Sequence, residues 1–161
     1  MILLNPGPVT LTNRVKNSLL KEDLCHREPE FSKLQQDIRE KLLRVYNLNH
    51  SDWTSILLTG SGTAAVEALI TSLVPKNAKL LIAENGVYGE RLQKIASTFR
   101  IDNDQIKSDW IDAINLVSLE KAIATKKYSH LALVHHETTT GRLNELDQIQ
   151  DICEQFDCKI L

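Results

Sequence analysis

A glycine-flanked pair of hydroxyl residues opens the first of three segments whose side chains suit a bound ligand. Residues 60–65 read Gly-Ser-Gly-Thr-Ala-Ala and run directly into a segment with the composition of a helix. Glycine lets the backbone approach an anion closely, and the start of a helix presents unpaired N–H groups with a partial positive charge. Ser61 and Thr63 add hydroxyl donors on either side of Gly62. The segment predicts a phosphate site, and the alternative is a glycine turn in which a hydroxyl caps the helix.

Two further segments carry groups that suit a planar ring. Residues 84–91 place Tyr88 between two glycines, and an aromatic ring can stack on a heterocycle. Residues 135–142 contain three consecutive threonines, and the hydroxyl of the first, Thr138, could bond to a ring oxygen or nitrogen. Each segment also has a purely structural interpretation, because Tyr88 could pack in the core and the threonines could cap a turn.

The first segment also fits a dinucleotide site. Residues 60–65 satisfy the pattern G-x-G-x-x-A, and Glu84 ends the next predicted strand, where an acid that binds a ribose would stand. Against this interpretation, that fingerprint normally follows the first strand of its domain, whereas a helical lead-in of about 50 residues precedes it here. It also leaves Tyr88 and the threonines without a role.

Hydrolase and metal chemistry are less well supported. A serine-hydrolase elbow, G-x-S-x-G, needs glycine where Thr59 stands. His135, His136 and Glu137 are adjacent in a predicted extended segment, so their side chains point in opposite directions, and no spaced Cys or His completes a set of ligands. We therefore predict no metal site.

The pattern of apolar residues predicts a scaffold in which strands alternate with helices. Strands are predicted at residues 55–59, 79–83 and 130–135, with a short one around Ile106, and helices at 64–73, 88–99, 118–124 and 146–156. This alternation indicates an α/β fold with a largely parallel sheet and flanking helices. In such a sheet the carboxyl ends of the strands share one edge, so the three segments can converge there.

The first 50 residues differ from the rest. After a turn-rich start, one helix is predicted after Thr12 and a second from Pro29, whose apolar residues recur every three or four positions and predict one buried face: Phe31, Leu34, Ile38, Leu42 and Val45. We expect a helical N-terminal arm over residues 1–50 and a sheet domain over 51–161. Residues 159–161 look like the start of a buried strand, so we expect the chain to be part of a longer fold.

Composition excludes several classes of protein. The 161 residues are 42% hydrophobic with a net charge of −2, an average globular balance without the basic excess of a nucleic-acid-binding module. No apolar run is long enough to cross a bilayer. Three cysteines are few and cannot all pair with one another, so we expect no disulfide framework, and this number suits a reducing compartment. We expect a cytoplasmic protein that binds neither nucleic acid nor membrane.

Taken together, five segments resemble one family. They are residues 4–9, 25–31, 60–65, 85–91 and 137–141, in the order and at about the spacing of the class V (fold-type I) pyridoxal-phosphate aminotransferases. Single motifs of this kind are weak, but five in series are specific for the class. The versions His-Arg-Glu-Pro-Glu-Phe at 26–31 and Glu-Thr-Thr-Thr-Gly at 137–141 resemble the branch that acts on 2-aminoethylphosphonate and pyruvate.

The resemblance implies pyridoxal 5′-phosphate as the cofactor. Its phosphate would lie at the start of the helix, its ring against the tyrosine, and its phenolic oxygen near a threonine. The cofactor-binding residues that the resemblance implies are Ser61, Gly62, Thr63, Tyr88 and Thr138.

The resemblance also assigns substrate residues and locates what this chain lacks. Asn5 and Gly7 would line the substrate pocket, and Arg27 would contact a phosphonate or a subunit interface. Pyridoxal chemistry requires a Schiff-base lysine and an acid at the pyridine nitrogen, which in the family fall beyond Leu161. The chain thus resembles the N-terminal half of the large cofactor-binding domain, and we assign it no catalytic residue.

The expected reaction of the full-length protein, a homodimer by resemblance, is transfer of the amino group of 2-aminoethylphosphonate to pyruvate, giving phosphonoacetaldehyde and alanine. Three alternatives stay open at this point. They are a class V enzyme of the serine– or alanine–glyoxylate type, an NAD-dependent oxidoreductase built on residues 60–65 and Glu84, and a non-catalytic binding domain with the same fold.

Overall fold

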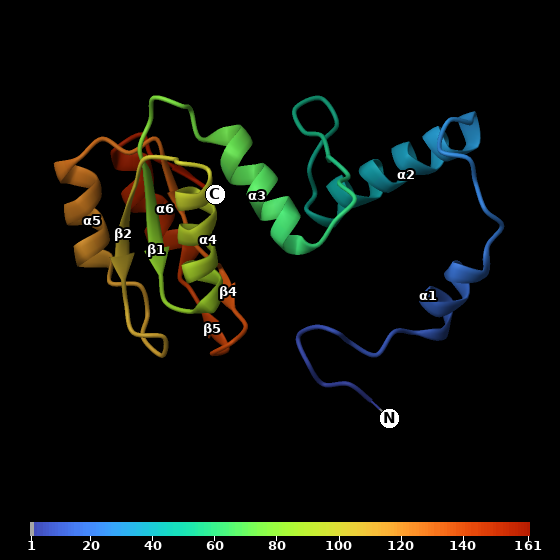
Figure 1. Ribbon diagram of the computed structural model, residues 1–161, viewed down its shortest axis with the longest axis horizontal. Helices are drawn as coiled ribbons and strands as arrows, with labels where there is room; N and C mark the ends of the chain where they lie inside the picture. The colour runs from blue at the N-terminus through green and yellow to red at the C-terminus, as the bar shows by residue number, and fades with distance from the viewer. Residues whose placement is uncertain (1) are drawn as a thin grey trace. The chain divides into compact units, whose positions relative to one another are not determined.

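The computed structural model describes residues 2–161. The chain divides into two compact units, the first ending at Thr59 and the second beginning at Gly60. Each unit is described by itself below, and the secondary structure of both is shown in Figure 1.

The first unit contains the two predicted helices. Helix α1 (Asn13–Asn17) begins after Thr12, whose side chain accepts a hydrogen bond from the backbone N–H of Val15, and it continues into the short 3-10 helix η1 (Ser18–Leu20). Helix α2 (Pro29–Val45) has proline in its first turn, where the missing N–H costs no hydrogen bond.

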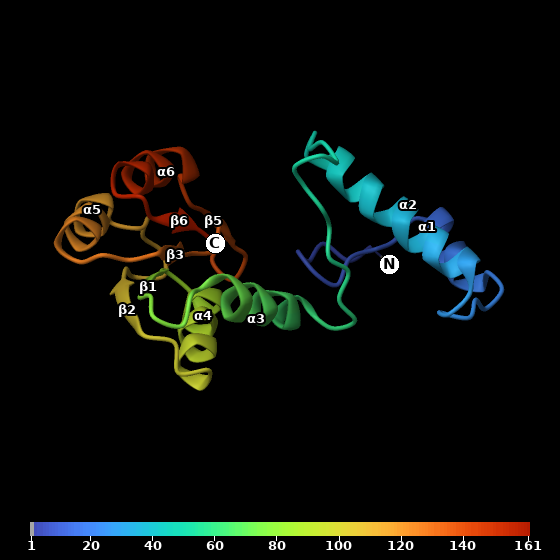
Figure 2. The same cartoon turned by 90° about the horizontal axis from the view of Figure 1, so that it is seen from above.

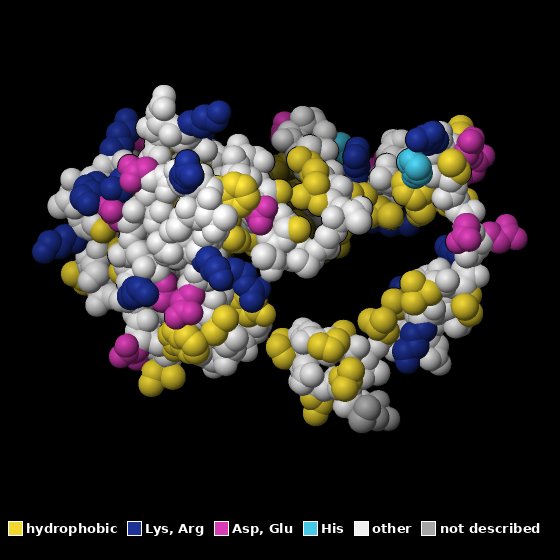
Figure 3. Space-filling view, in the orientation of Figure 1, with side chains coloured by type: hydrophobic (Ala, Val, Ile, Leu, Met, Phe, Trp, Pro, Cys, Tyr) yellow, Lys and Arg dark blue, Asp and Glu magenta, His cyan; other side chains and the backbone are white. Residues whose placement is uncertain are grey.

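The apolar stripe of α2 is not buried in the described residues, contrary to the prediction. Leu43 is the buried residue of this helix, whereas Leu34, Ile38 and Leu42 are exposed and Val45 is 70% exposed. Hydrophobic side chains accordingly appear on the surface of this unit (Figure 3). Helices α1 and η1 contain no buried residue, so this unit has too little packed structure of its own to cover the stripe.

The second unit is built on a four-stranded parallel sheet, which confirms the predicted fold class. Its strands are β1 (Leu80–Glu84), β2 (Asn103–Lys107), β3 (His130–Ala132) and β6 (Lys159–Ile160), in the order β2-β1-β3-β6. Helices α3 (Gly62–Leu73) and α4 (Val87–Thr98) lie on one face, and α5 (Leu116–Thr125) and α6 (Leu146–Gln155) on the other (Figure 2). A short antiparallel hairpin, β4 (His136–Glu137) with β5 (Arg142–Leu143), follows β3.

Strand β1 separates two hydrophobic cores because its successive side chains point to opposite faces. Leu80 and Ile82 pack with residues of α3 and α4, such as Ile70. Leu81 and Ala83 pack on the other face, with residues of β3, α5 and α6. All five residues of β1 are buried, as expected for the central strand of a parallel sheet covered on both sides.

The predicted strand at residues 55–59 is wrong. This segment has no regular secondary structure and pairs with no strand among the described residues, and the side chains of Ile56 and Leu58 are 77% and 53% exposed. The helix predicted at residues 118–124 begins earlier, at Leu116. Asn115 is its N-cap, and the Asn115 side chain accepts a hydrogen bond from the N–H of Ser118 at 2.9 Å.

The amino-terminal edge of the sheet is held by ion pairs around Asp104 of β2. Its carboxylate lies 2.7 Å from the Lys126 ammonium and 3.0 Å from that of Lys79, and it accepts a 2.6 Å hydrogen bond from the Tyr128 hydroxyl. Bonds from Lys126, Tyr128 and Lys79 hold the pKa of Asp104 far below its usual value. One carboxylate thus joins β2 to the residues that precede β1 and β3.

Asp104→Asn should lower the free energy of unfolding by about 1 kcal/mol at pH 7. Because the folded-state pKa of Asp104 is depressed, its stabilisation is fully present above the unfolded-state pKa of about 4 and is lost as the pH falls below that value. The difference between wild type and variant in urea unfolding should therefore shrink from pH 7 to pH 3. Asp102→Asn, which alters an exposed carboxylate on the same Lys79, is the control. Equal effects of the two substitutions would contradict a special role for Asp104.

Candidate active site

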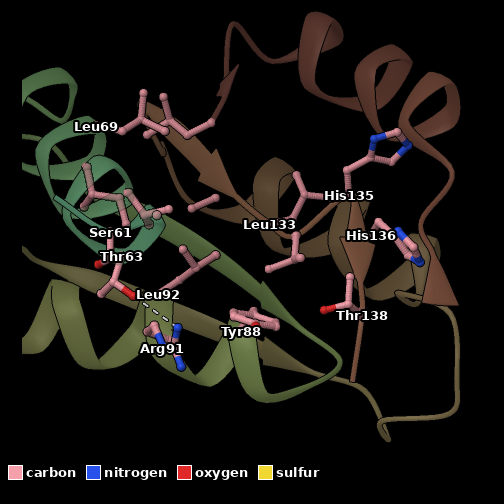
Figure 4. A pocket seen from close by; sticks show the side chains of 16 residues that line it. Ser61, Thr63, Leu69, Tyr88, Arg91, Leu92, Leu133, His135, His136 and Thr138 are labelled. Atoms are coloured by element: carbon pink, nitrogen blue, oxygen red, sulfur yellow. Dashed lines mark hydrogen bonds between the residues drawn. The ribbon is translucent and has the colours of Figure 1, made fainter. Parts of the chain in front are cut away.

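The structure brings the five predicted cofactor residues to one cavity at the carboxyl edge of the sheet. The cavity has a volume of about 570 Å³, and Figure 4 shows the side chains that line it. Its lining includes Ser61, Gly62, Thr63, Tyr88 and Thr138. They come from the start of α3, the start of α4 and the segment after β3, so the three segments converge as the topology predicts.

The wall of the cavity is apolar apart from a few polar groups. Aliphatic side chains of α3, of α4 and of the end of β3 with the residues after it form much of its surface, including Leu69, Leu92 and Leu133. Of the lining residues, all of which are described, Arg91 alone carries a permanent charge. An apolar cavity with one cation and several hydroxyls is suited to a ligand that combines a ring with an anionic group.

The start of α3 has the geometry for an anion. Ser61 is the N-cap residue, with an extended backbone, and its side chain makes no capping hydrogen bond. The first N–H groups of a helix have no partner within it, so those of the first turn can bind a ligand. A Cβ built on Gly62 meets no atom within 4 Å, so the space beside this backbone is open. The start of α3 therefore fits a phosphate, as its composition predicts.

Tyr88 and Arg91 lie one turn apart on α4 and form a layered contact. The guanidinium carbon of Arg91 lies 4.8 Å from the centre of the Tyr88 ring, and Nη1 donates a 3.1 Å hydrogen bond to the Thr63 hydroxyl. Tyr88 is 38% exposed, so it is not the core residue that one interpretation allowed. Arg91 thus joins the ring to the start of α3, a role that its sequence context does not indicate.

Buried polar side chains lie close to the cavity, and the sequence analysis assigns them no role there. Asn85 and Asn144 exchange two side-chain hydrogen bonds, at 2.8 and 3.2 Å, and Asn144 also donates to the backbone oxygen of Val134 at 2.7 Å. Glu137, in strand β4 of the hairpin, is also fully buried. A polar residue directly after a buried apolar strand, as Asn85 follows β1, is the feature that could have indicated such a group.

The remaining predicted residues lie elsewhere. Asn5, Gly7 and Arg27 belong to the first unit, where all three are exposed, and their proposed contacts with substrate stay predictions. His135 and His136 border the cavity but point away from Tyr88 (Figure 4). Within residues 2–161, no three His, Cys, Asp or Glu side chains are grouped in a way that could hold a metal.

The structure does not favour the dinucleotide interpretation. No strand among the described residues leads into Gly60, so the strand-turn-helix context of that fingerprint is missing. Glu84 is buried, forms an ion pair with Lys107 at 3.4 Å and accepts a hydrogen bond from Gln105. Its carboxylate is therefore already occupied and is not free to bind a ribose.

Comparison with known proteins identifies the family. The sequence model of the aminotransferase class-V family matches residues 13–161. The chain belongs to this family. A 2-aminoethylphosphonate–pyruvate transaminase of Bacillus cereus is 40% identical over 154 residues, which are 95% of this chain and 41% of the relative. A bifunctional phosphonoacetaldehyde hydrolase/aminoethylphosphonate transaminase of Clostridioides difficile is 38% identical over 156 residues, 96% of this chain and 24% of that protein.

Solved structures agree with this assignment. An alanine–glyoxylate aminotransferase from Nostoc sp. superposes with a TM-score of 0.88 at 31% identity over 99% of this chain and 42% of its own. A pyridoxamine-pyruvate aminotransferase from Mesorhizobium loti, 22% identical, shares the fold with a TM-score of 0.89 over 100% of this chain and 41% of its own. The chain spans about two fifths of the length of the B. cereus transaminase and of both these structures.

Membership of the class V aminotransferases implies pyridoxal phosphate as the cofactor, and the cavity fits it. The open start of α3 suits the phosphate, the exposed face of Tyr88 suits the ring, and Arg91 suits the negative charge. No helix among residues 2–161 is both long and apolar enough to cross a membrane.

Arg91→Met should weaken the binding of inorganic phosphate to the cofactor-free protein about fivefold, because the cavity loses its one permanent positive charge. Isothermal titration calorimetry measures this affinity. Lys94→Met removes an exposed positive charge from the same helix and should leave the affinity unchanged. If Arg91→Met bound phosphate as tightly as wild type, Arg91 would serve only to join Tyr88 to Thr63.

Proposed function

We propose that the full-length protein carrying this chain transfers the amino group of 2-aminoethylphosphonate to pyruvate, giving phosphonoacetaldehyde and alanine. The observation that carries the proposal is the cavity, which gathers the start of α3, Tyr88 and Thr138 in a member of the class V aminotransferases. The choice of substrates is supported by relatives named for this reaction at 38–40% identity.

We infer that this chain contributes the side of the site that binds the cofactor. Ser61, Gly62 and Thr63 bind the phosphate, Tyr88 stacks on the ring, and the Thr138 hydroxyl bonds to the phenolic oxygen or close to it. When bound, pyridoxal phosphate supplies a ring that accepts electrons during transamination. The apolar wall around Leu92 and Leu133 offers the ring a nonpolar surface.

The remainder of the site comes from other parts of the protein. In this proposal, the Schiff-base lysine and the acid at the pyridine nitrogen follow Leu161, and residues 51–161 are the first part of the cofactor-binding domain. Asn5 and Gly7 line the substrate pocket, and Arg27 binds the phosphonate, because a guanidinium matches a cluster of anionic oxygens. We expect residues 1–50 to act as an arm in a cytoplasmic homodimer.

A second candidate is transamination with glyoxylate as the acceptor. The alanine–glyoxylate aminotransferase from Nostoc sp. supports it, at 31% identity over 99% of this chain. The two reactions use the same cofactor chemistry and differ in the groups that select the substrate, so the cavity described here is compatible with both.

Incubation of the full-length protein with 2-aminoethylphosphonate and pyruvate should yield phosphonoacetaldehyde and alanine in equal amounts. Chromatography of the amino acids and chemical trapping of the aldehyde measure the two products. Alanine or serine with glyoxylate serves as the competing substrate pair. Faster turnover of glyoxylate, with no aldehyde from the phosphonate, would replace the first candidate with the second.

Gly62→Val should weaken the binding of pyridoxamine phosphate to the full-length protein about 100-fold, because the side chain would occupy the space beside the first turn of α3. A Cβ at this position meets no neighbouring atom within 4 Å, and urea unfolding of the variant against wild type checks that the fold is kept. Gly62→Ala, which adds less bulk, should show a smaller loss. Unchanged affinity in Gly62→Val would remove this segment from the site.

A further inference from the structure

Glu137 is a fully buried carboxylate without a cationic partner among the described residues. The other buried glutamate, Glu84, is paired with Lys107. Burial of a carboxylate is costly unless hydrogen bonds and local dipoles compensate for the lost water. The groups that surround Glu137 therefore indicate what it does.

The two oxygens of Glu137 join the hairpin to the start of α4. Oε2 accepts a 3.0 Å hydrogen bond from the backbone N–H of Tyr88, and Oε1 accepts one of 2.6 Å from the Thr139 hydroxyl. Tyr88 lies in the first turn of α4, where the helix dipole favours a negative charge. The carboxylate is thus stabilised by the same helix end that presents the Tyr88 ring.

Gly86 adapts the chain to this carboxylate. A Cβ at Gly86 would lie 2.3 Å from Cγ and 2.4 Å from Cδ of Glu137, which is closer than side chains can approach. The backbone of Gly86 is extended, with φ at 169°, so this steric contact rather than the backbone conformation requires glycine. The start of α4 therefore packs directly against the side chain of Glu137.

Glu137 also controls the segment that carries Thr138. Its backbone oxygen accepts hydrogen bonds from the N–H groups of Thr140 and Gly141, at 3.2 and 2.9 Å, which close the turn around Thr138. The Glu137 side chain thus bonds to the backbone N–H of Tyr88, and the backbone oxygen of Glu137 fixes the turn that contains Thr138. One residue thereby sets the position of the ring relative to the hydroxyl.

We propose that Glu137 is a positioning residue for the cofactor ring, acting through Tyr88 and Thr138. This role rests on the proposed function, because it assigns the ring to the space between these two side chains. The prediction is selective, since the Glu137 carboxylate bonds to Tyr88 and Thr139 and makes no hydrogen bond, among the described residues, to the start of α3 or to Arg91, which are assigned to the phosphate. Loss of Glu137 should affect a ligand that has the ring and spare a ligand that is only a phosphate.

The test compares the Glu137→Gln variant of the full-length protein with wild type. Glutamine keeps the volume but replaces one acceptor oxygen by an NH₂ group, so either the backbone N–H of Tyr88 or that of Thr139, which also bonds to Oε1 at 3.4 Å, loses its acceptor. Pyridoxamine phosphate, which binds without a covalent bond, should bind about tenfold more weakly, whereas inorganic phosphate should bind unchanged. The circular dichroism band that the bound ring acquires should also decrease.

Two further variants distinguish positioning from general damage to the fold. Thr139 is an exposed residue whose hydroxyl bonds to Glu137, so Thr139→Val should fold normally. It should weaken the binding of pyridoxamine phosphate less than Glu137→Gln does and leave that of inorganic phosphate unchanged. This variant tests the proposal even if Glu137→Gln fails to fold. Glu90→Gln removes an exposed carboxylate from the first turn of the same helix and should change neither affinity.

Three results would overturn the proposal. Equal weakening of pyridoxamine phosphate and inorganic phosphate would show that Glu137 merely stabilises the fold. Unchanged binding of pyridoxamine phosphate in both Glu137→Gln and Thr139→Val would exclude the positioning role and leave the proposed function intact. Failure of wild type to bind pyridoxamine phosphate would instead overturn the proposed function, and this role with it.

Discussion

The parallel pairing of β1 with β2 on one side and with β3 on the other decides which parts of this chain can meet. Parallel strands end at the same edge, so the segments that follow Glu84 and Ala132 leave the sheet side by side. The first leads into α4 with Tyr88, and the second carries Thr138. Tyr88 and Thr138, which are fifty positions apart in the sequence, therefore share one cavity, and their side chains can act on one ligand.

The edge of the sheet is also where the interior changes from apolar to polar. The two cores on either side of β1 are hydrophobic, but at its end stand Glu84 and Asn85, and near them Glu137 and Asn144, all buried. Among the described residues no buried side-chain nitrogen or oxygen lacks a hydrogen-bond partner. Satisfied buried groups of this kind hold loops in one arrangement, because any shift leaves a donor or acceptor unpaired. This polar layer gives the exposed residues of the cavity a rigid support.

Local sequence patterns were sufficient to predict some elements. The uninterrupted apolar run of β1 is typical of a buried parallel strand, and this supports the fold class. The glycines at the start of α3 are typical of an anion-binding helix start, and they indicate the cavity residues. The exposed segment around Ile56 has the same apolar composition as a strand, yet strand formation depends on a partner, which composition does not reveal. The burial of Glu137 likewise depends on Gly86, which lies some fifty residues away in the sequence. Tertiary contacts, rather than periodicity, create such features.

The charge of the cavity limits what this part of the chain can select. Arg91 is its one permanent charge, and the guanidinium lies beside Thr63 at the start of α3, so its charge is available to a phosphate at that end. A substrate with a phosphonate brings a second group of comparable charge, and one cation cannot balance both anions. The proposed reaction therefore requires another cation outside the cavity lining, and Arg27 is a candidate of the right chemistry. Cofactor binding and substrate choice therefore depend on different groups, and in this proposal the unit that begins at Gly60 provides those for the cofactor.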